Sequence, residues 1–80
     1  MDRNEVMAVL QNIFADVFAD KDIRLTEAAN ADDIEAWDSL THITILEAVQ
    51  DEYQITFDLD EIIELNTAGD IVDAVLAKMG

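Results

Sequence analysis

Turn-forming residues are nearly absent from this chain of 80 residues: it has no proline, and its only glycines are Gly69 and Gly80. An all-β fold made of many hairpins depends on such residues at its turns. The sequence therefore argues against an all-β fold. Because 51% of the residues are hydrophobic, we expect a folded chain rather than a disordered one. The length fits one domain that spans residues 1–80.

Apolar residues recur at helical spacing in the first segment, residues 4–18, whose start either Asn4 or Asp2 can cap. A second helical pattern begins at Asp38 or Ser39, both of which are good capping residues, and runs to about residue 53. We interpret both segments as helices, and we expect the one over residues 4–18 to pack against the core.

A short third helix is predicted over residues 58–65, after the extended stretch "YQITF". The fourth helix has the clearest signal, because Thr67 and Asp70 form the T-x-x-D pattern of a capping box. Apolar residues with a period of about 3.6 follow this box and predict one buried face.

Helical periodicity is lost between residues 19 and 38, where isolated apolar residues stand among polar ones. These apolar residues are Ile23, Leu25, Ile34 and Trp37. We interpret this segment as an ordered loop that its apolar residues pin to the core, with a short helical turn near "NADDIEAW". A loop of this length is unusual in a compact domain and is often functional. The predicted fold is all-α: a small helical bundle with three main helices, one short helix and a long loop between the first and second helices.

The charge of the chain is strongly acidic. Nineteen Asp and Glu against four Lys and Arg give a net charge of −15, and no Lys or Arg lies between Arg24 and Lys78. Nucleic acid is therefore excluded as a partner, because phosphate binding requires protein cations. A protein with a basic surface is favoured instead. On charge alone, acids that only keep a small domain soluble are an equally good explanation.

The chain contains no cysteine, which excludes disulfides and thiolate metal sites within it. Its N-terminus lacks the pattern of a secretory signal, and no stretch approaches the roughly 18 apolar residues of a membrane span. We expect a cytoplasmic protein that does not insert into membranes. Its small size and large charge favour a monomer.

The second helix has two distinct faces at about 100° per residue. One face gathers Ile45, Leu46, Val49 and Tyr53 and is expected to be buried. The opposite face and its flank combine exposed apolar residues with carboxylates, which suits a basic partner. We call the predicted partner-binding residues the docking strip: Leu40, Ile43, Glu47 and Asp51.

Ser39 is predicted at the N-terminus of this helix, after the loop, so that its hydroxyl faces solvent. Free backbone N–H groups and the positive end of the helix dipole favour a phosphate at such a position. The alternative is that Ser39 only caps the helix.

The stretch Asp38-Ser39-Leu40, "DSL", resembles the motif of acyl carrier proteins in which serine accepts a 4′-phosphopantetheine arm from coenzyme A. The resemblance covers nearly the whole chain. An amphipathic first helix and a long loop precede "DSL", "ILEAVQDEYQITF" is similar to the family's acid-rich helix end, and "LDEIIELNTAGDIVDAVLAKM" resembles its last two helices.

The resemblance implies that Ser39 is the attachment point and that Asp38 supports its modification by a phosphopantetheinyl transferase. Acyl groups would be carried as thioesters on the terminal sulfur of the arm, and the docking strip would meet acyl-loading and chain-processing enzymes with basic surfaces. Apolar residues of the core would line a space for the acyl chain: Ile45, Leu46, Val49, Phe57, Ile62, Leu65 and Ile71.

Two residues depart from the pattern of fatty-acid carriers. Trp37 stands where a small residue is more common, and the uncharged Thr44 lies in a region where those carriers place an early Glu. The chain thus looks more like discrete carriers of polyketide and other secondary-metabolite pathways. The alternatives are an aminoacyl or peptidyl carrier and an acidic interaction module without a prosthetic group. Trp37 itself is interpreted as an anchor of the loop.

Asp38, Ser39 and His42 are the residue types of a hydrolytic triad, yet an Asp and a Ser adjacent on one turn cannot both flank the imidazole. No Gly-x-Ser-x-Gly elbow is present either. We therefore expect that the chain is not an enzyme, and that His42 is a packed, hydrogen-bonded helix residue. The acids of "NADDIE" and "DLDEIIE" lack the spacing of a calcium-binding loop, so no metal site is expected.

Overall fold

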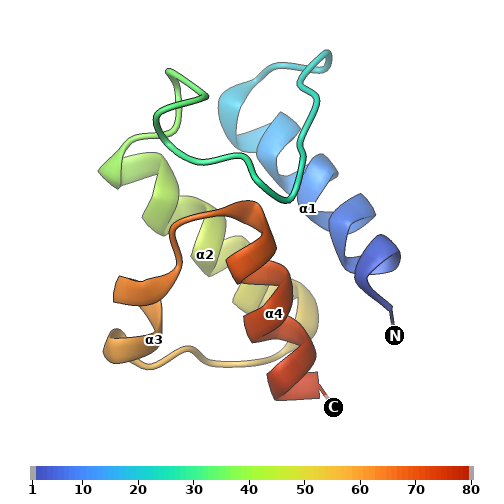
Figure 1. The fold of residues 1–80 in the computed structure, drawn as a ribbon, viewed down its shortest axis with the longest axis vertical. Coiled ribbons are helices and arrows are strands. Elements are labelled where there is room, and N and C mark those ends of the chain that lie inside the picture. The colour runs from blue at the N-terminus through green and yellow to red at the C-terminus, as the bar shows by residue number, and fades with distance from the viewer. Residues whose placement is uncertain (1, 80) are drawn as a thin grey trace.

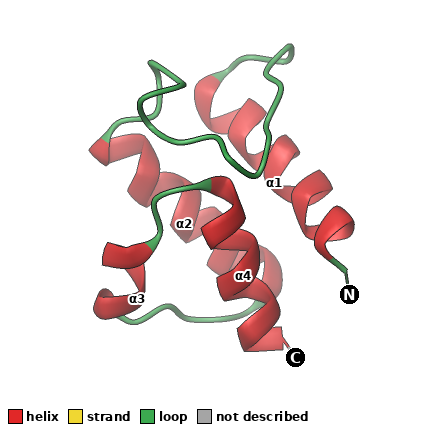
Figure 2. Ribbon diagram, viewed as in Figure 1, coloured by secondary structure: helices red, strands yellow, loops and turns green. Residues whose placement is uncertain are grey.

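A computed structural model describes residues 2–79 and shows an all-helical bundle (Figures 1 and 2). Its elements are α1 (Arg3–Phe18), α2 (Ser39–Tyr53), α3 (Leu59–Glu64) and α4 (Ala68–Met79). The predicted fold class is confirmed, with three main helices, a short helix and a long loop between α1 and α2. Within residues 2–79 no helix combines the length and the apolar character that crossing a bilayer requires.

Side chains cap the helices largely where the sequence predicts caps. Asp2, rather than Asn4, caps α1, because its carboxylate accepts a hydrogen bond from the Glu5 backbone N–H at 2.9 Å. At the start of α4 the predicted capping box is confirmed. The Asp70 N–H donates to Thr67 Oγ1 at 3.0 Å, and the Thr67 N–H donates back to Asp70 Oδ2 at 3.1 Å.

Two helices end in a way that the sequence does not signal. Ala19 follows α1 with φ 53°, and Gln54 follows α2 with φ 55°, so both residues adopt the left-handed conformation that usually requires glycine. Each cap N–H donates to a carbonyl in the last turn of its helix. The chain therefore ends both helices without glycine, the residue for which a positive φ costs least.

The core lies between α1, α2 and α4, and α1 packs against both of the other helices. It includes Trp37 from the loop and Phe57 and Leu65 from the later connections. The fully buried apolar residues of the three helices are Val6, Leu10, Phe14, Ile45, Val49, Ala68, Ile71, Val72 and Val75. By contrast, α3 has no buried residue and lies at the edge of the bundle (Figure 1). The edge position of α3 leaves Leu59 and Ile63 exposed to solvent, while Ile62 packs against the core.

The loop between α1 and α2 runs across the end of the bundle at which α2 begins (Figure 1). The isolated apolar residues of the loop contact the core, as predicted. Ile23, Leu25 and Ile34 are partly buried, and Trp37 is buried. The side chain of Gln11 also holds the loop, because its Nε2 donates to the Ile23 carbonyl and its Oε1 accepts from the Leu25 N–H at 2.9 Å. The loop is thus ordered by specific contacts, as the sequence predicts.

The expected helical turn near "NADDIEAW" is only a pair of isolated turns. In these turns the Asp33 N–H donates to the Asn30 carbonyl and the Trp37 N–H donates to the Ile34 carbonyl, both at 3.0 Å. Asn30 instead forms an isolated bridge with Thr67. This pairing ties the loop to the start of α4.

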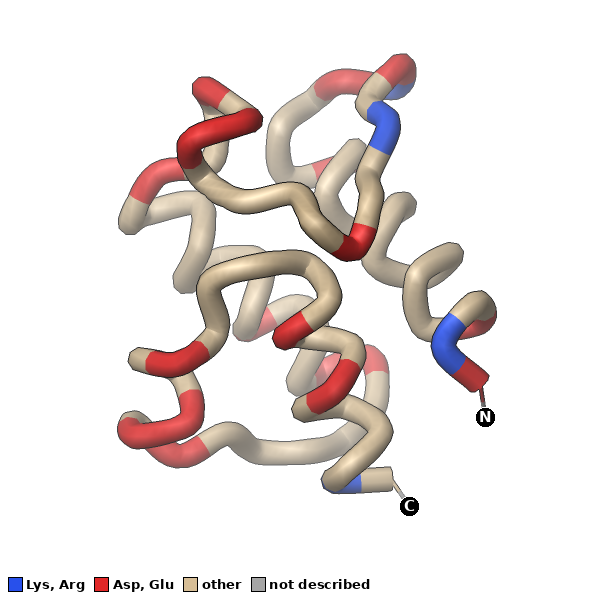
Figure 3. The backbone as a smooth tube through the Cα atoms, viewed as in Figure 1, with Lys and Arg blue, Asp and Glu red and all other residues tan. Residues whose placement is uncertain are grey.

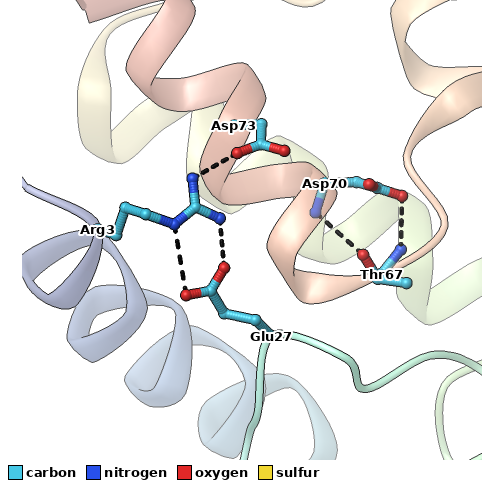
Figure 4. Close-up of polar contacts among 5 residues, drawn as sticks. All are labelled: Arg3, Glu27, Thr67, Asp70 and Asp73. Atoms are coloured by element: carbon cyan, nitrogen blue, oxygen red, sulfur yellow. Dashed lines mark hydrogen bonds and ion pairs between the residues drawn. The ribbon is translucent and has the colours of Figure 1, made fainter.

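The loop crosses α4 closely at Gly69. The Gly69 N–H donates to the Glu27 carbonyl at 2.8 Å, and a Cβ at Gly69 would lie 3.0 Å from that same oxygen. Only a residue without a side chain fits this approach without displacing the loop. Near the same place, Arg3 pairs with both Glu27 and Asp73, which joins α1, the loop and α4 (Figure 4).

Candidate functional site

Ser39 is the first residue of α2, and its side chain is exposed. It does not cap the helix. That role belongs to Asp38, whose Oδ1 accepts hydrogen bonds from the Leu40 and Thr41 N–H groups, both at 3.0 Å. The Thr41 hydroxyl accepts in turn from the Asp38 N–H at 2.9 Å and completes a capping box. Among the described residues none hydrogen-bonds the Ser39 hydroxyl, which is therefore available for chemistry.

The electrostatics at the start of α2 differ from the expectation of several free N–H groups beside Ser39. Asp38 already occupies two of these donors. The hydrogen bond from the Thr41 N–H is the main reason that the pKa of Asp38 lies below its usual value, with smaller contributions from the Thr41 side chain and the Leu40 N–H. A carboxylate thus stands next to the hydroxyl at neutral pH.

Trp37 fixes the end of the loop just before Asp38. Its ring packs edge-on against Phe14, with centroids 4.9 Å apart, and its indole Nε1–H donates to His42 Nδ1 at 2.9 Å. The prediction that Trp37 anchors the loop is confirmed, and so is the prediction that His42 is packed and hydrogen-bonded. The pairing also means that His42 Nδ1 is not oriented by Asp38, as a hydrolytic triad would require.

An open pocket of about 510 Å³ lies beside Ser39. We call it the Ser39 pocket. The loop, the first turn of α2, α3 and the connection after α3 all contribute to it, and its lining is mainly apolar. The lining residues are Ala31, Trp37, Asp38, Ser39, His42, Ile43, Ile62 and Asn66. Sequence reasoning did not identify Ala31 or Asn66, because only the fold brings their segments to the start of α2.

The docking strip is exposed, as its position on the helical wheel predicts. Leu40 and Ile43 keep 75% and 54% of their surface accessible, and Glu47 and Asp51 are also exposed. Two apolar side chains of α3 that the sequence did not single out, Leu59 and Ile63, are exposed by 72% and 67%. Both α2 and α3 therefore present apolar side chains to solvent.

The residues expected to line a space for an acyl chain lie mostly in the packed core. Ile62 is the exception: it is partly buried and lines the Ser39 pocket. The buried members are Ile45, Leu46, Val49, Phe57, Leu65 and Ile71. Within residues 2–79, no group of three or more His, Asp or Glu side chains is placed to hold a metal ion.

Comparison with known proteins relates the chain to one family and to a solved structure. Residues 8–75 match the family model described as "Phosphopantetheine attachment site". The fold is similar to the solution structure of a holo acyl carrier protein from Geobacter metallireducens, with a TM-score of 0.85 and 39% sequence identity over 92% of this chain and 85% of that chain. A search of curated proteins gives no match.

Proposed function

This chain belongs to the acyl carrier family whose members bear a covalently attached phosphopantetheine, and on that premise we propose that Ser39 is its attachment point. The observation that carries the proposal is the exposed Ser39 hydroxyl at the start of α2, which opens on the Ser39 pocket while Asp38 caps the helix. Ser39 is also the only serine in the chain. The arm would be joined to the Ser39 Oγ through a phosphodiester.

The residues around Ser39 fit a linear, mainly uncharged arm. The Ser39 pocket opens beside the hydroxyl, and Ile43 and Ile62 give it apolar walls against which such an arm can pack. Asp38 holds the first turn of α2 and so keeps Ser39 at the surface for the transferase. The bound arm supplies a terminal thiol on which acyl groups are held as thioesters. Because the chain has no cysteine, that thiol would be the only one in the molecule.

The proposed partners are a phosphopantetheinyl transferase and acyl-loading and chain-processing enzymes with basic docking surfaces. Among the charged residues of α2, α3 and α4 all but Lys78 are acidic, and no Lys or Arg lies between Arg24 and Lys78 (Figure 3). The docking strip offers apolar side chains among carboxylates, and α3 exposes two further apolar side chains, Leu59 and Ile63. Complementary charge would select the partner and speed the encounter.

Carrier domains of this family are generally non-catalytic, and we propose that this chain likewise transports acyl groups without catalysing their reactions. We place it in the cytoplasm as a monomer, with residues 1–80 forming one carrier domain. Thr44 supports a polyketide or secondary-metabolite cargo over a fatty-acid one, because it adds no charge to the first two turns of α2. Trp37 supports the cargo assignment less, since its packing on Phe14 gives it a structural role in any carrier.

The test is the mass of the intact protein after incubation with coenzyme A and a broad-specificity phosphopantetheinyl transferase. We expect the wild-type chain to gain one phosphopantetheine and one titratable thiol. Ser39→Ala should gain neither, because it lacks the hydroxyl that forms the phosphodiester. Thr44→Ala is the matched control: it removes another exposed hydroxyl of α2, which donates to the Leu40 carbonyl, and should be modified like the wild type.

An unchanged mass in the folded wild-type chain would contradict the proposal. It would favour the acidic interaction module without a prosthetic group. Modification of Ser39→Ala would instead move the attachment point to another residue.

A further inference from the structure

The chain contains one histidine and one tryptophan, and the two side chains are paired. The Trp37 indole Nε1–H donates to His42 Nδ1 at 2.9 Å, and the rings stack with centroids 5.9 Å apart and an interplanar angle of 23°. An indole N–H can only donate, so Nδ1 must be the unprotonated nitrogen of the imidazole. The ring proton therefore resides on Nε2.

Burial supports this neutral form of the imidazole. His42 is partly buried, and burial lowers its pKa below the ordinary value. His42 also lines the Ser39 pocket, and among the described residues none accepts a hydrogen bond from its Nε2–H. The imidazole of His42 thus offers one unused N–H donor at a pocket that has few other hydrogen-bond donors.

Donors for a phosphate are scarce at the start of α2. The Leu40 and Thr41 N–H groups donate to the Asp38 carboxylate, and the His42 N–H donates to the Asp38 carbonyl. The lining of the pocket includes no Lys or Arg. A phosphate on Ser39 would also stand next to the negative charge of Asp38. The start of α2 alone therefore stabilises such a phosphate less than the N-terminus of a helix usually does, because it has fewer free N–H donors and a neighbouring negative charge.

We propose that His42 binds the arm, by donating a hydrogen bond from its Nε2–H to the phosphodiester on Ser39. Ser39 and His42 are three residues apart on α2, so their side chains lie on the same face of the helix, and both line the same pocket. Trp37 is the positioning residue, because its hydrogen bond to Nδ1 directs the only ring proton to Nε2. The inference rests on the proposed attachment at Ser39.

Phosphorus NMR of the full-length holo protein tests the proposal, because the arm carries the only phosphorus. The phosphodiester itself does not titrate between about pH 5 and 8, where histidine does. Asp38 is the one other titratable group that lines the pocket, and its lowered pKa keeps it ionised over this range. We expect the phosphorus shift to change with pH in step with the imidazole resonances. We also expect the negative arm to raise the pKa of His42 relative to the apo protein.

His42→Gln is the control variant, and circular dichroism checks that it folds. The phosphorus shift of its holo form should not depend on pH in this range. A phosphorus shift in the wild-type protein that does not follow the imidazole titration would overturn the proposal, even with the arm attached. This result depends on the wild-type protein alone, so it stands whether or not the variant folds. An unmodified mass after the transferase reaction would instead remove the proposed attachment at Ser39, and the His42 proposal with it.

Discussion

At the scale of single residues, two neighbours at the start of α2 have different roles. Asp38 caps the helix through its carboxylate, and Ser39 keeps its hydroxyl exposed. A serine that served as the cap would have its oxygen engaged with backbone N–H groups. The arrangement "DS" therefore frees the serine for modification.

Replacing Asp38 by alanine is expected to destabilise the fold, because the Leu40 and Thr41 N–H groups lose their acceptor. Asp38→Asn should be much closer to the wild type at neutral pH, since an asparagine side chain retains an acceptor oxygen. Urea unfolding of the three proteins compares their free energies. An alanine variant as stable as the wild type would show that the cap contributes nothing.

The same residue predicts how stability depends on pH. The pKa of Asp38 is lower in the folded chain than its ordinary value, so its stabilising contribution is present above about pH 4 and is lost as the pH falls through its folded pKa. Asp38→Asn should therefore lose less stability than the wild type on acidification. Asp51→Asn, which removes an exposed acid of the same helix, should retain the wild-type acid sensitivity. Equal acid sensitivity in all three proteins would contradict the assignment.

At the scale of elements, the helix starts follow the sequence more closely than the helix ends. Starts are encoded by capping side chains such as Asp2, Asp38 and the Thr67–Asp70 pair. The ends after α1 and α2 require positive φ, and the chain supplies Ala19 and Gln54 rather than glycine. Local backbone hydrogen bonds close both ends, since the Asp20 N–H donates to the Ala15 carbonyl at 3.0 Å and the Ile55 N–H donates to the Gln50 carbonyl at 3.1 Å.

Ala19→Gly is expected to raise the free energy of unfolding by about 0.5–1 kcal/mol. The left-handed conformation costs a residue with a Cβ about 1–2 kcal/mol, and the greater freedom of glycine in the unfolded chain offsets part of the gain. Ala8→Gly, at an exposed position within α1, should instead lower the free energy of unfolding by about 1 kcal/mol. Thermal unfolding measures both variants, and destabilisation by Ala19→Gly would show that its φ differs in solution.

At the scale of the whole molecule, acidic charge dominates the surface. Of the four basic residues, Arg3 pairs with Glu27 and Asp73, and Lys78 pairs with Glu61. These pairs are at the surface and contribute little each. The remaining excess of negative charge repels itself in the folded state and attracts basic surfaces.

Raising the ionic strength from about 0.01 M to about 0.15 M should therefore stabilise the apo chain, because the Debye length falls from about 30 Å to about 8 Å and screens the repulsion. The same change should raise the KM of the transferase for the chain, since docking relies on opposite charges. Thermal unfolding and initial rates at each salt concentration measure the two effects. A Tm that falls as salt is added would show that the ion pairs outweigh the repulsion. A KM that does not change with salt concentration would contradict electrostatic docking.

The sequence by itself determined what depends on neighbours along the chain. Helical periodicity predicted the three main helices, capping patterns placed the starts of α2 and α4, and the helical wheel identified the exposed strip of α2. The motif "DSL", together with the helical segments on either side of it, indicated the family. Each of these signals lies within a few turns of one helix, where spacing along the chain fixes spacing in space.

Only the tertiary structure decided what depends on segments that are far apart in the chain. It built the Ser39 pocket from the loop, α2 and the segment of α3 that contains Ile62, and it set Gly69 against Glu27. It also buried Trp37 against Phe14, which holds the indole where it donates to His42. Such contacts arise when the apolar faces pack together, and the pattern within each segment does not specify which partner its side chains will meet.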